Sequence, residues 1–329
     1  EMSDSDVINN RALTGDGGGI YSGWAGGNFR LDGSDLKSLT IVNSRVSGNR
    51  AAGNGGGIYS VQILEITDST VADNTAGGVG NADGGGGGGG VFALAPAQGV
   101  TPPQNADNRR GETIITGSTF SGNEALAGNG GAIVVDVEIG ALEPVFTMTN
   151  STVAYNTAEW NAGGLWLSSQ DSGINAVGVE STIVFSTIVG NESTSGFGGG
   201  VGTRYGDLLM WGSILADNVM HNSGASPSVT DLYMYSGGAD SDGYNWITAD
   251  PQGGFNTEPS DVVGQPAVLA ALADNGGPTQ TMMPTDPQLG NVPLGNCIGT
   301  NSSILDTDQR GSPRPGTDGE CFRGSVEPN

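Results

Sequence analysis

A six-residue motif of the form Ser-x-apolar-x-x-Asn recurs through the first two thirds of the chain and constrains the fold more than any other feature. Apolar residues also stand three and, in most copies, five positions before the serine, in the period of two that is typical of a strand. The motif places its closing residue at Asn10, Asn49, Asn74, Asn123, Asn156, Asn191 and Asn218. The same local structure is therefore expected in successive copies.

The distance between copies varies, although the motif itself does not. Consecutive serines are separated by as few as 25 and as many as 49 residues, which indicates fixed strands joined by loops that accept insertions. The shortest unit is too short for a propeller blade and too rich in glycine, asparagine and β-branched residues for a helical repeat. It fits one coil of a parallel β-helix, in which each coil stacks about 4.8 Å from the last.

The fold predicted from this pattern is all-β: a right-handed, single-stranded parallel β-helix of the pectate-lyase-like solenoid type over residues 1–236. In about seven coils, the apolar positions would form internal stacks and the asparagines a hydrogen-bonded ladder at a corner. Glycine and asparagine suit such corners because both tolerate positive φ. A loop insertion is expected near residues 75–111, where a run of glycines precedes a proline-rich stretch.

The composition of the sequence changes near residue 237, where the repeat ends and a proline-rich region begins. Residues 237–329 are expected to form an irregular cap or tail packed on the β-helix. Cys297 and Cys321 are the only cysteines, and two thiols with one distant histidine fit a disulfide better than a metal site. A disulfide predicts an extracellular or cell-surface location, since such bonds persist in oxidising compartments. Two unrelated buried thiols are the alternative.

Four stretches of this region carry a resemblance to a known family. They are Asp-Gly-Tyr-Asn-Trp-Ile at 242–247, Asp-Val-Val-Gly at 261–264, Leu-Ala-Asp-Asn-Gly-Gly-Pro-Thr-Gln-Thr at 272–281 and Thr-Asp-Gln-Arg-Gly-Ser-Pro-Arg-Pro at 307–315. These stretches resemble the tail of bacterial choice-of-anchor (Q-type) surface proteins. The upstream Gly-Gly-Gly-Ile-Tyr and Ser-Thr-Val repeats are similar to those of polymorphic outer-membrane proteins. The resemblance implies a secreted or surface-attached right-handed β-helix, usually of unassigned activity.

The charge balance excludes several classes of partner. With 35 acidic and 11 basic residues, the formal net charge is −24, and a surface of this sign repels nucleic acids and anionic lipids. No apolar run is long enough to span a bilayer, so no membrane-spanning segment is expected. Neutral glycans and components of the cell surface stay compatible with this charge.

The same composition argues against an enzyme. Lyases of acidic polysaccharides need a basic side chain, and basic residues are sparse along the coils. A hydrolase of neutral glycans needs two facing carboxylates about 5–9 Å apart, and the repeat holds no fixed pair of acids. The single histidine, His221, is expected on a loop, and no Gly-x-Ser-x-Gly motif is present. We predict no catalytic residue and keep a polysaccharide lyase or glycoside hydrolase as an alternative.

Calcium is the one cofactor for which the sequence offers a candidate. Asp240, Asp242 and Asn245 have the spacing that opens an EF-hand loop, but Pro251 occupies the place of the closing bidentate glutamate. The match therefore covers the beginning of such a loop alone, and no other metal or cofactor is predicted.

The repeat is already under way at the first residues, where Met2 occupies an internal apolar position. An uncovered first coil exposes a strand edge, so either the chain is cleaved there or another subunit covers that end. Head-to-tail stacking of identical molecules would generate a filament. The sequence thus favours a structural extracellular protein that self-associates into a fibre or surface layer. An adhesin or glycan-binding module that uses exposed Trp24, Trp160 or Trp166 is the alternative.

Overall fold

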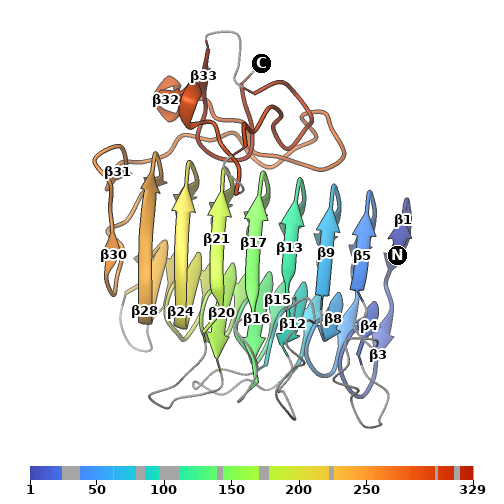
Figure 1. Ribbon diagram of the computed structural model, residues 1–329. Coiled ribbons are helices and arrows are strands. Elements are labelled where there is room, and N and C mark those ends of the chain that lie inside the picture. Colours follow the sequence, from blue (N-terminus) through green and yellow to red (C-terminus); the bar gives the residue numbers. More distant parts are fainter. Residues whose placement is uncertain are drawn as a thin grey trace, which may run out of the picture.

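The structure, a computed structural model, describes residues 1–23, 38–61, 63–78, 86–95, 111–138, 144–169, 178–221, 226–300, 303–314 and 319–328. Parallel strands dominate it and coil into a right-handed β-helix, in which successive coils lie side by side along one axis (Figure 1). The predicted all-β, parallel β-helix is confirmed. Much of the insertion expected near residues 75–111 lies outside the described residues, as does Trp24.

Three sheets form the wall of the β-helix, and a small fourth sheet lies outside it. The 14-stranded sheet contains β1 (Met2–Ser3), β5 (Ser38–Val42), β9 (Ile63–Thr67), β13 (Thr113–Thr116), β17 (Val145–Thr149), β21 (Glu180–Val184), β24 (Val201–Trp211), β20 (Leu165–Ser169), β16 (Ile133–Val137), β12 (Val91–Ala95), β8 (Ile58–Val61) and β4 (Ile20–Ser22), with β28 (Leu232–Gly243) and β30 (Phe255–Asn256). The nine-stranded sheet contains β2 (Asp6–Ile8), β6 (Arg45–Ser47), β10 (Thr70–Ala72), β14 (Thr119–Ser121), β18 (Thr152–Ala154), β22 (Thr187–Val189), β25 (Ile214–Ala216), β29 (Trp246–Ile247) and β31 (Val262–Val263). The eight-stranded sheet contains β3 (Arg11–Ala12), β7 (Arg50–Ala51), β11 (Thr75–Ala76), β15 (Glu124–Ala125), β19 (Thr157–Ala158), β23 (Glu192–Ser193), β26 (Val219–Met220) and β27 (Ser228–Val229).

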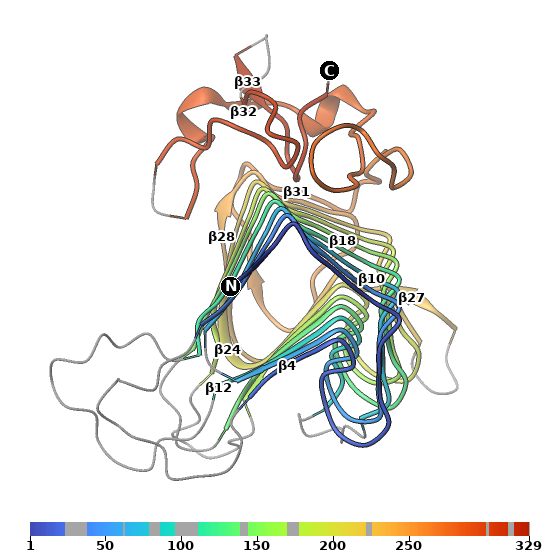
Figure 2. The same ribbon diagram turned by 90° about the vertical axis from the view of Figure 1, so that its right-hand side faces the viewer.

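Each coil crosses the three sheets in turn, and the coils superimpose when the molecule is viewed along its axis (Figure 2). The 14-stranded sheet has two arms, one from β1 to β21 and the other from β4 to β20. β24 and β28 are long strands that each belong to both arms. In these two coils the chain passes from one arm to the other without an insertion.

The interior is filled by columns of like residues, because parallel strands in register place equivalent side chains one above the other. Ile66 of β9, for example, pairs with Ile41 of the coil before and with Ile115 of the coil after. On the nine-stranded sheet Val71 pairs with Val46 and Phe120. The apolar positions around the sequence motif are therefore the core of the β-helix, and from the third coil onward these side chains are buried.

The corners between sheets require left-handed backbone, which explains much of the glycine in the sequence. At the corner between β13 and β14, Gly117 has a φ of 61°. The equivalent residue of the coil before is Asp68, which has a φ of 50°. The Asp68 carboxylate lies against the next coil, so a Cβ atom at Gly117 would be 2.3 Å from Asp68 Oδ1. Glycine is therefore favoured there, because it adopts positive φ readily and leaves space for the Asp68 carboxylate.

Parallel pairing continues beyond residue 236, where the sequence motif ends. β28 runs across this position, and β29 and β31 add two further coils to the nine-stranded sheet. Ile247 pairs with Leu215 on one side and with Val263 on the other. The β-helix thus extends to Val263, and the boundary expected from the motif lies inside a strand.

The rest of the chain folds back over the outside of the β-helix. It contains two short 3-10 helices, η1 (Pro287–Leu289) and η2 (Leu294–Asn296), and the antiparallel pair β32 (Val292–Pro293) and β33 (Glu320–Cys321). Figure 2 shows this region above the corner where the 14-stranded and nine-stranded sheets meet. Across the described ranges, no helix has the length and apolar character needed to cross a membrane.

Candidate functional site

An asparagine column, made of the seven motif asparagines, runs along the corner between the nine-stranded and eight-stranded sheets. Asn123 Oδ1 accepts hydrogen bonds from the backbone N of Asn74 at 3.1 Å and from its Nδ2 at 2.9 Å. Asn123 Nδ2 in turn donates to the carbonyl of Val71 at 2.9 Å. The same link between coils recurs along the whole column. From Asn49 onward, each amide therefore ties coils together and donates to a main-chain carbonyl of the coil before.

A serine column runs in parallel, along the corner between the 14-stranded and nine-stranded sheets. Ser118 Oγ accepts a hydrogen bond from Ser69 N at 3.1 Å and donates to Thr116 O at 2.8 Å. The same pattern joins Ser5, Ser44, Ser69, Ser118, Ser151, Ser186 and Ser213. Asn245 and Asp261 then take the place of serine, since Ser213 N donates to Asn245 Oδ1 and Asn245 N to Asp261 Oδ1.

The asparagine column ends at a buried carboxylate, Asp231. Its Oδ1 accepts from Asn218 N at 3.1 Å and Asn218 Nδ2 at 2.8 Å, whereas its Oδ2 accepts from Thr248 Oγ1 and Ala249 N, both at 2.8 Å. Burial raises the pKa of Asp231, and the hydrogen bonds from Asn218, Thr248 and Ala249 oppose that rise. The motif did not reveal this residue, because it follows Asn218 too closely in the sequence to be part of another copy.

The three calcium candidates do not share one environment. Asp240 is exposed and accepts a hydrogen bond from Asn256 Nδ2 at 2.6 Å, and Asp242 is also exposed. Asn245 is buried in the serine column, where its Nδ2 donates to Met210 O at 3.1 Å. In the described part of the chain, no three His, Cys, Asp or Glu side chains are grouped so that they could hold a metal ion.

The described residues after Gly264 form what we call the clasp, which grips the outer face of the nine-stranded sheet. Gln309 reaches two coils at once: its Nε2 donates to Thr119 Oγ1 at 2.8 Å, and its Oε1 accepts from Thr152 Oγ1 at 2.6 Å. Ser325 continues the contact on the next coil, where its backbone N donates to Thr187 Oγ1 at 3.0 Å. A threonine on each of these three strands is therefore a contact point for the clasp.

Buried charges hold the clasp together. Arg310 and Asp308 pair at 2.8 Å, and Arg314 and Glu327 pair at 3.1 Å, with side chains that are at most 3% exposed. The Arg314 guanidinium lies 4.4 Å from the centre of the Phe185 ring, at a corner of the β-helix. Burial lowers the pKa of Arg314 to about 10, so this cation remains protonated at neutral pH.

The expected disulfide joins Cys297 and Cys321 inside the clasp. Both cysteines are fully buried and belong to an apolar cluster with Val184, Phe185 and Val292. The bond therefore packs against the corner of the β-helix and fixes the part of the clasp that covers it. A covalent link at this place supports folding in an oxidising compartment.

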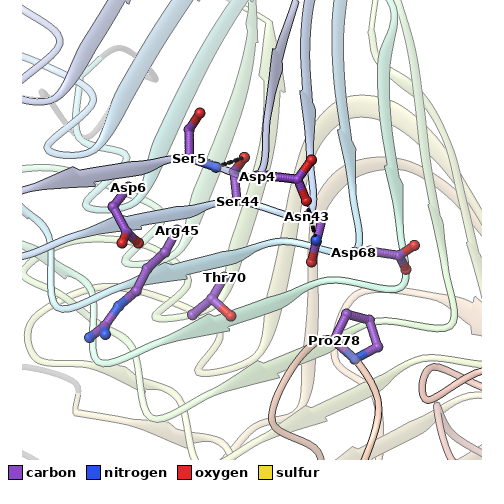
Figure 3. Close-up of a pocket in the computed structure, with 9 residues that line it drawn as sticks. All are labelled: Asp4, Ser5, Asp6, Asn43, Ser44, Arg45, Asp68, Thr70 and Pro278. Carbon is purple, nitrogen blue, oxygen red and sulfur yellow. Dashed lines mark hydrogen bonds between the residues drawn. The ribbon is translucent and has the colours of Figure 1, made fainter.

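A polar groove opens where the clasp approaches the first three coils (Figure 3). Its volume is about 410 Å³, and its lining consists of Asp4, Ser5, Asp6, Asn43, Ser44, Arg45, Asp68, Thr70 and, from the clasp, Pro278. Asp4 Oδ1 accepts from Asn43 Nδ2 at 2.5 Å, and burial raises the pKa of Asp68. This lining can hydrogen-bond a neutral polar ligand such as a sugar, but it contains no aromatic face for stacking.

The aromatic candidates are placed differently from the prediction. Trp166 is 2% exposed and packs with Tyr59 and Phe92, because its ring fills the space over Gly202 of the next coil. The expectation that Trp166 is an exposed binding residue is therefore wrong, and Trp160 is half-buried.

Two tyrosines and the histidine are at least partly exposed on the outer surface of the β-helix. Tyr21 and Tyr235 are each more than half exposed, and Tyr235 lies against the Arg204 guanidinium, 5.5 Å from the ring centre. His221 is half-buried, and its Nε2 lies 2.8 Å from Glu192 Oε1. Its nearest charged neighbour is thus a glutamate on the adjacent coil.

Comparison with known proteins finds a similarity in two stretches of the chain. Residues 43–61 and 117–136 are similar to the Chlamydia polymorphic membrane protein (Chlamydia_PMP) repeat. The two ranges cover equivalent parts of two coils, β6 to β8 and β14 to β16, and each contains one serine and one asparagine of the columns. No curated protein and no solved structure matches the chain. The chain is thus a parallel β-helix repeat protein, and parts of two of its coils are similar to the polymorphic membrane protein repeat.

Proposed function

We propose that the chain is a cell-surface β-helix with a structural role. The two stretches that match the polymorphic membrane protein repeat carry this proposal, since that repeat is named for membrane proteins. The Cys297–Cys321 disulfide supports it, because such bonds are typical of extracytoplasmic proteins. The resemblance of the clasp to Q-type choice-of-anchor proteins stays a prediction, and it points to the same location.

Antibodies against the clasp are expected to label intact cells that make the protein, without permeabilisation. The clasp is suited to this test because it lies on the outside of the β-helix (Figure 1). Immunofluorescence before and after permeabilisation is the measurement, and an antibody against a cytoplasmic protein is the control. Label that appears after permeabilisation alone would show that the surface location is wrong.

Head-to-tail self-association into a fibre or layer is the finer part of the proposal. Parallel strands pair along the axis of a β-helix, so a second copy can lengthen the rod by the same pairing that joins its coils. Negative-stain electron microscopy is expected to show rods longer than one molecule, with a sedimentation coefficient that rises with concentration. A species that sediments as a monomer at every concentration would contradict self-association.

A further inference from the structure

The polar columns of the β-helix have a direction. In the asparagine and serine columns, each backbone N–H donates to a side chain one coil later, toward the C-terminal end. A third column, at the glycine-rich corner before β4, β8, β16 and β20, runs the opposite way. There Asn54 N donates to Asp16 Oδ1 at 2.6 Å, and Asn161 N donates to Asn129 Oδ1 at 3.0 Å. Donors in this column point toward the N-terminal end.

The asparagine and serine columns each end at an aspartate, on the side to which their donors point. Asp231 ends the asparagine column and Asp261 ends the serine column. The third column is interrupted at Gly87, since Asn129 N donates to the backbone carbonyl of Gly86, and Asp16 ends the part of it that runs through Asn54. Aligned N–H groups leave partial positive charge at the end where they point, as they do at the N-terminus of a helix. A carboxylate fits this end because it accepts hydrogen bonds, carries negative charge and has no proton to pass on.

The two aspartates at the C-terminal end also hold the last coil closed. Asp231 uses one oxygen for the asparagine column and the other for Thr248 and Ala249, which follow β29. Asp261 accepts from Asn245 N at 2.8 Å through Oδ1 and from Glu258 N at 2.7 Å through Oδ2. We call residues 245–263 the closing segment. Asp231 fastens this segment to the preceding coil, whereas Asp261 joins its two ends and also accepts a hydrogen bond from Ser241 Oγ of β28 at 2.9 Å.

We propose that Asp231 and Asp261 are capping residues of the β-helix, which end its two main polar columns and lock the closing segment onto the last coil. An asparagine at 231 would keep the bond from Asn218 but turn an NH₂ group toward the donors of Thr248 and Ala249. The carboxylate is therefore required at the end of the column, whereas the amide is required within it. A copy that stacks on this end finds no side-chain donor on Asp231 or Asp261.

Hydrogen exchange of the full chain at neutral pH tests this proposal. In Asp231→Asn, the amide of Ala249 and its neighbours in the closing segment are expected to exchange about 10- to 100-fold faster than in the wild type. Amides in the middle of the β-helix should keep their wild-type rates. Asp217→Asn is the matched control, since it removes the same charge from an exposed position beside the closing segment and should leave exchange unchanged.

A second variant keeps the proposal testable if Asp231→Asn does not fold. Thr248→Val removes one donor to Asp231 Oδ2 and leaves the asparagine column intact. It is expected to accelerate exchange in the closing segment several-fold and at the amide of Asp217, which donates to Thr248 Oγ1 at 3.1 Å, with no change in the middle of the β-helix. Wild-type exchange of the closing segment in folded Asp231→Asn or Thr248→Val would overturn the proposal. So would acceleration of equal size in Asp217→Asn, because it would show an effect of net charge rather than of capping.

Discussion

Asn156→Ala is expected to lower the free energy of unfolding by about 3 kcal/mol. Asn156 is fully buried in the middle of the asparagine column. Its Nδ2 donates to Phe120 O at 3.0 Å, to Ala154 O at 3.1 Å and to Asn191 Oδ1 at 2.9 Å, and its Oδ1 accepts from Asn123 N and Nδ2, both at 2.9 Å. Alanine removes these bonds together and leaves buried donors and acceptors on both neighbouring coils unsatisfied.

Asn10→Ala supplies the matched control, because it makes the same chemical change at the exposed end of the same column. Asn10 donates to Asn49 Oδ1 through its backbone N and its Nδ2, and alanine keeps the first of these bonds. Water can solvate the groups left behind, so a loss below about 1 kcal/mol is expected. Urea denaturation followed by circular dichroism compares the variants, and equal losses would contradict a role for burial in the column.

The repeated parts of the molecule could be predicted because a β-helix stacks equivalent residues. Each asparagine of the column bonds to the equivalent residue one coil later, so every coil needs an asparagine at that position. The asparagine column is therefore visible in the sequence as a motif. The inner columns follow the same logic, since Ile41, Ile66 and Ile115 fill the same place in successive coils. Insertions between coils change the spacing of the motif without changing its residues.

The ends of the columns could not be predicted in this way, because an end occurs once. Asn245 and Asp261 occupy places equivalent to Ser213, but they differ from serine and from each other. The place of Asn245 in the serine column therefore depends on other coils and not on its neighbours in sequence. The two last coils were missed for the same reason, since β29 and β31 lack the residues that mark the earlier copies.

The contacts between the clasp and the β-helix also could not be predicted from the local sequence pattern. Gln309 bonds to Thr119 and Thr152, which lie 190 and 157 positions earlier in the chain. Nothing in the periodicity of the coils shows which face the clasp covers, since the threonines of the nine-stranded sheet are suited equally to solvent. The burial of Trp166 could not be predicted for a related reason, because it depends on Gly202 in the following coil.

Arg314→Met is expected to lower the free energy of unfolding by about 4 kcal/mol and to loosen the clasp. The Arg314 side chain is fully buried, pairs with Glu327 at 3.1 Å and donates to Phe322 O at 2.8 Å and Gly324 O at 3.0 Å. Methionine fills part of the space over the Phe185 ring but leaves the Glu327 carboxylate buried without this cation. Urea denaturation measures the loss, and limited proteolysis should show earlier cleavage within the clasp.

Two further variants separate the buried ion pair from a general loss of positive charge. Arg50→Met removes an arginine from an exposed place on β7 and should change stability by less than about 0.5 kcal/mol. Arg314→Met combined with Glu327→Gln removes both charges, so it should be less destabilised than Arg314→Met alone, because no buried carboxylate is left without its cation. If Arg314→Met lost no more stability than Arg50→Met, the pair would not hold the clasp. If the double variant lost more than the single one, the cost would lie in hydrogen bonds to the backbone rather than in the unpaired charge.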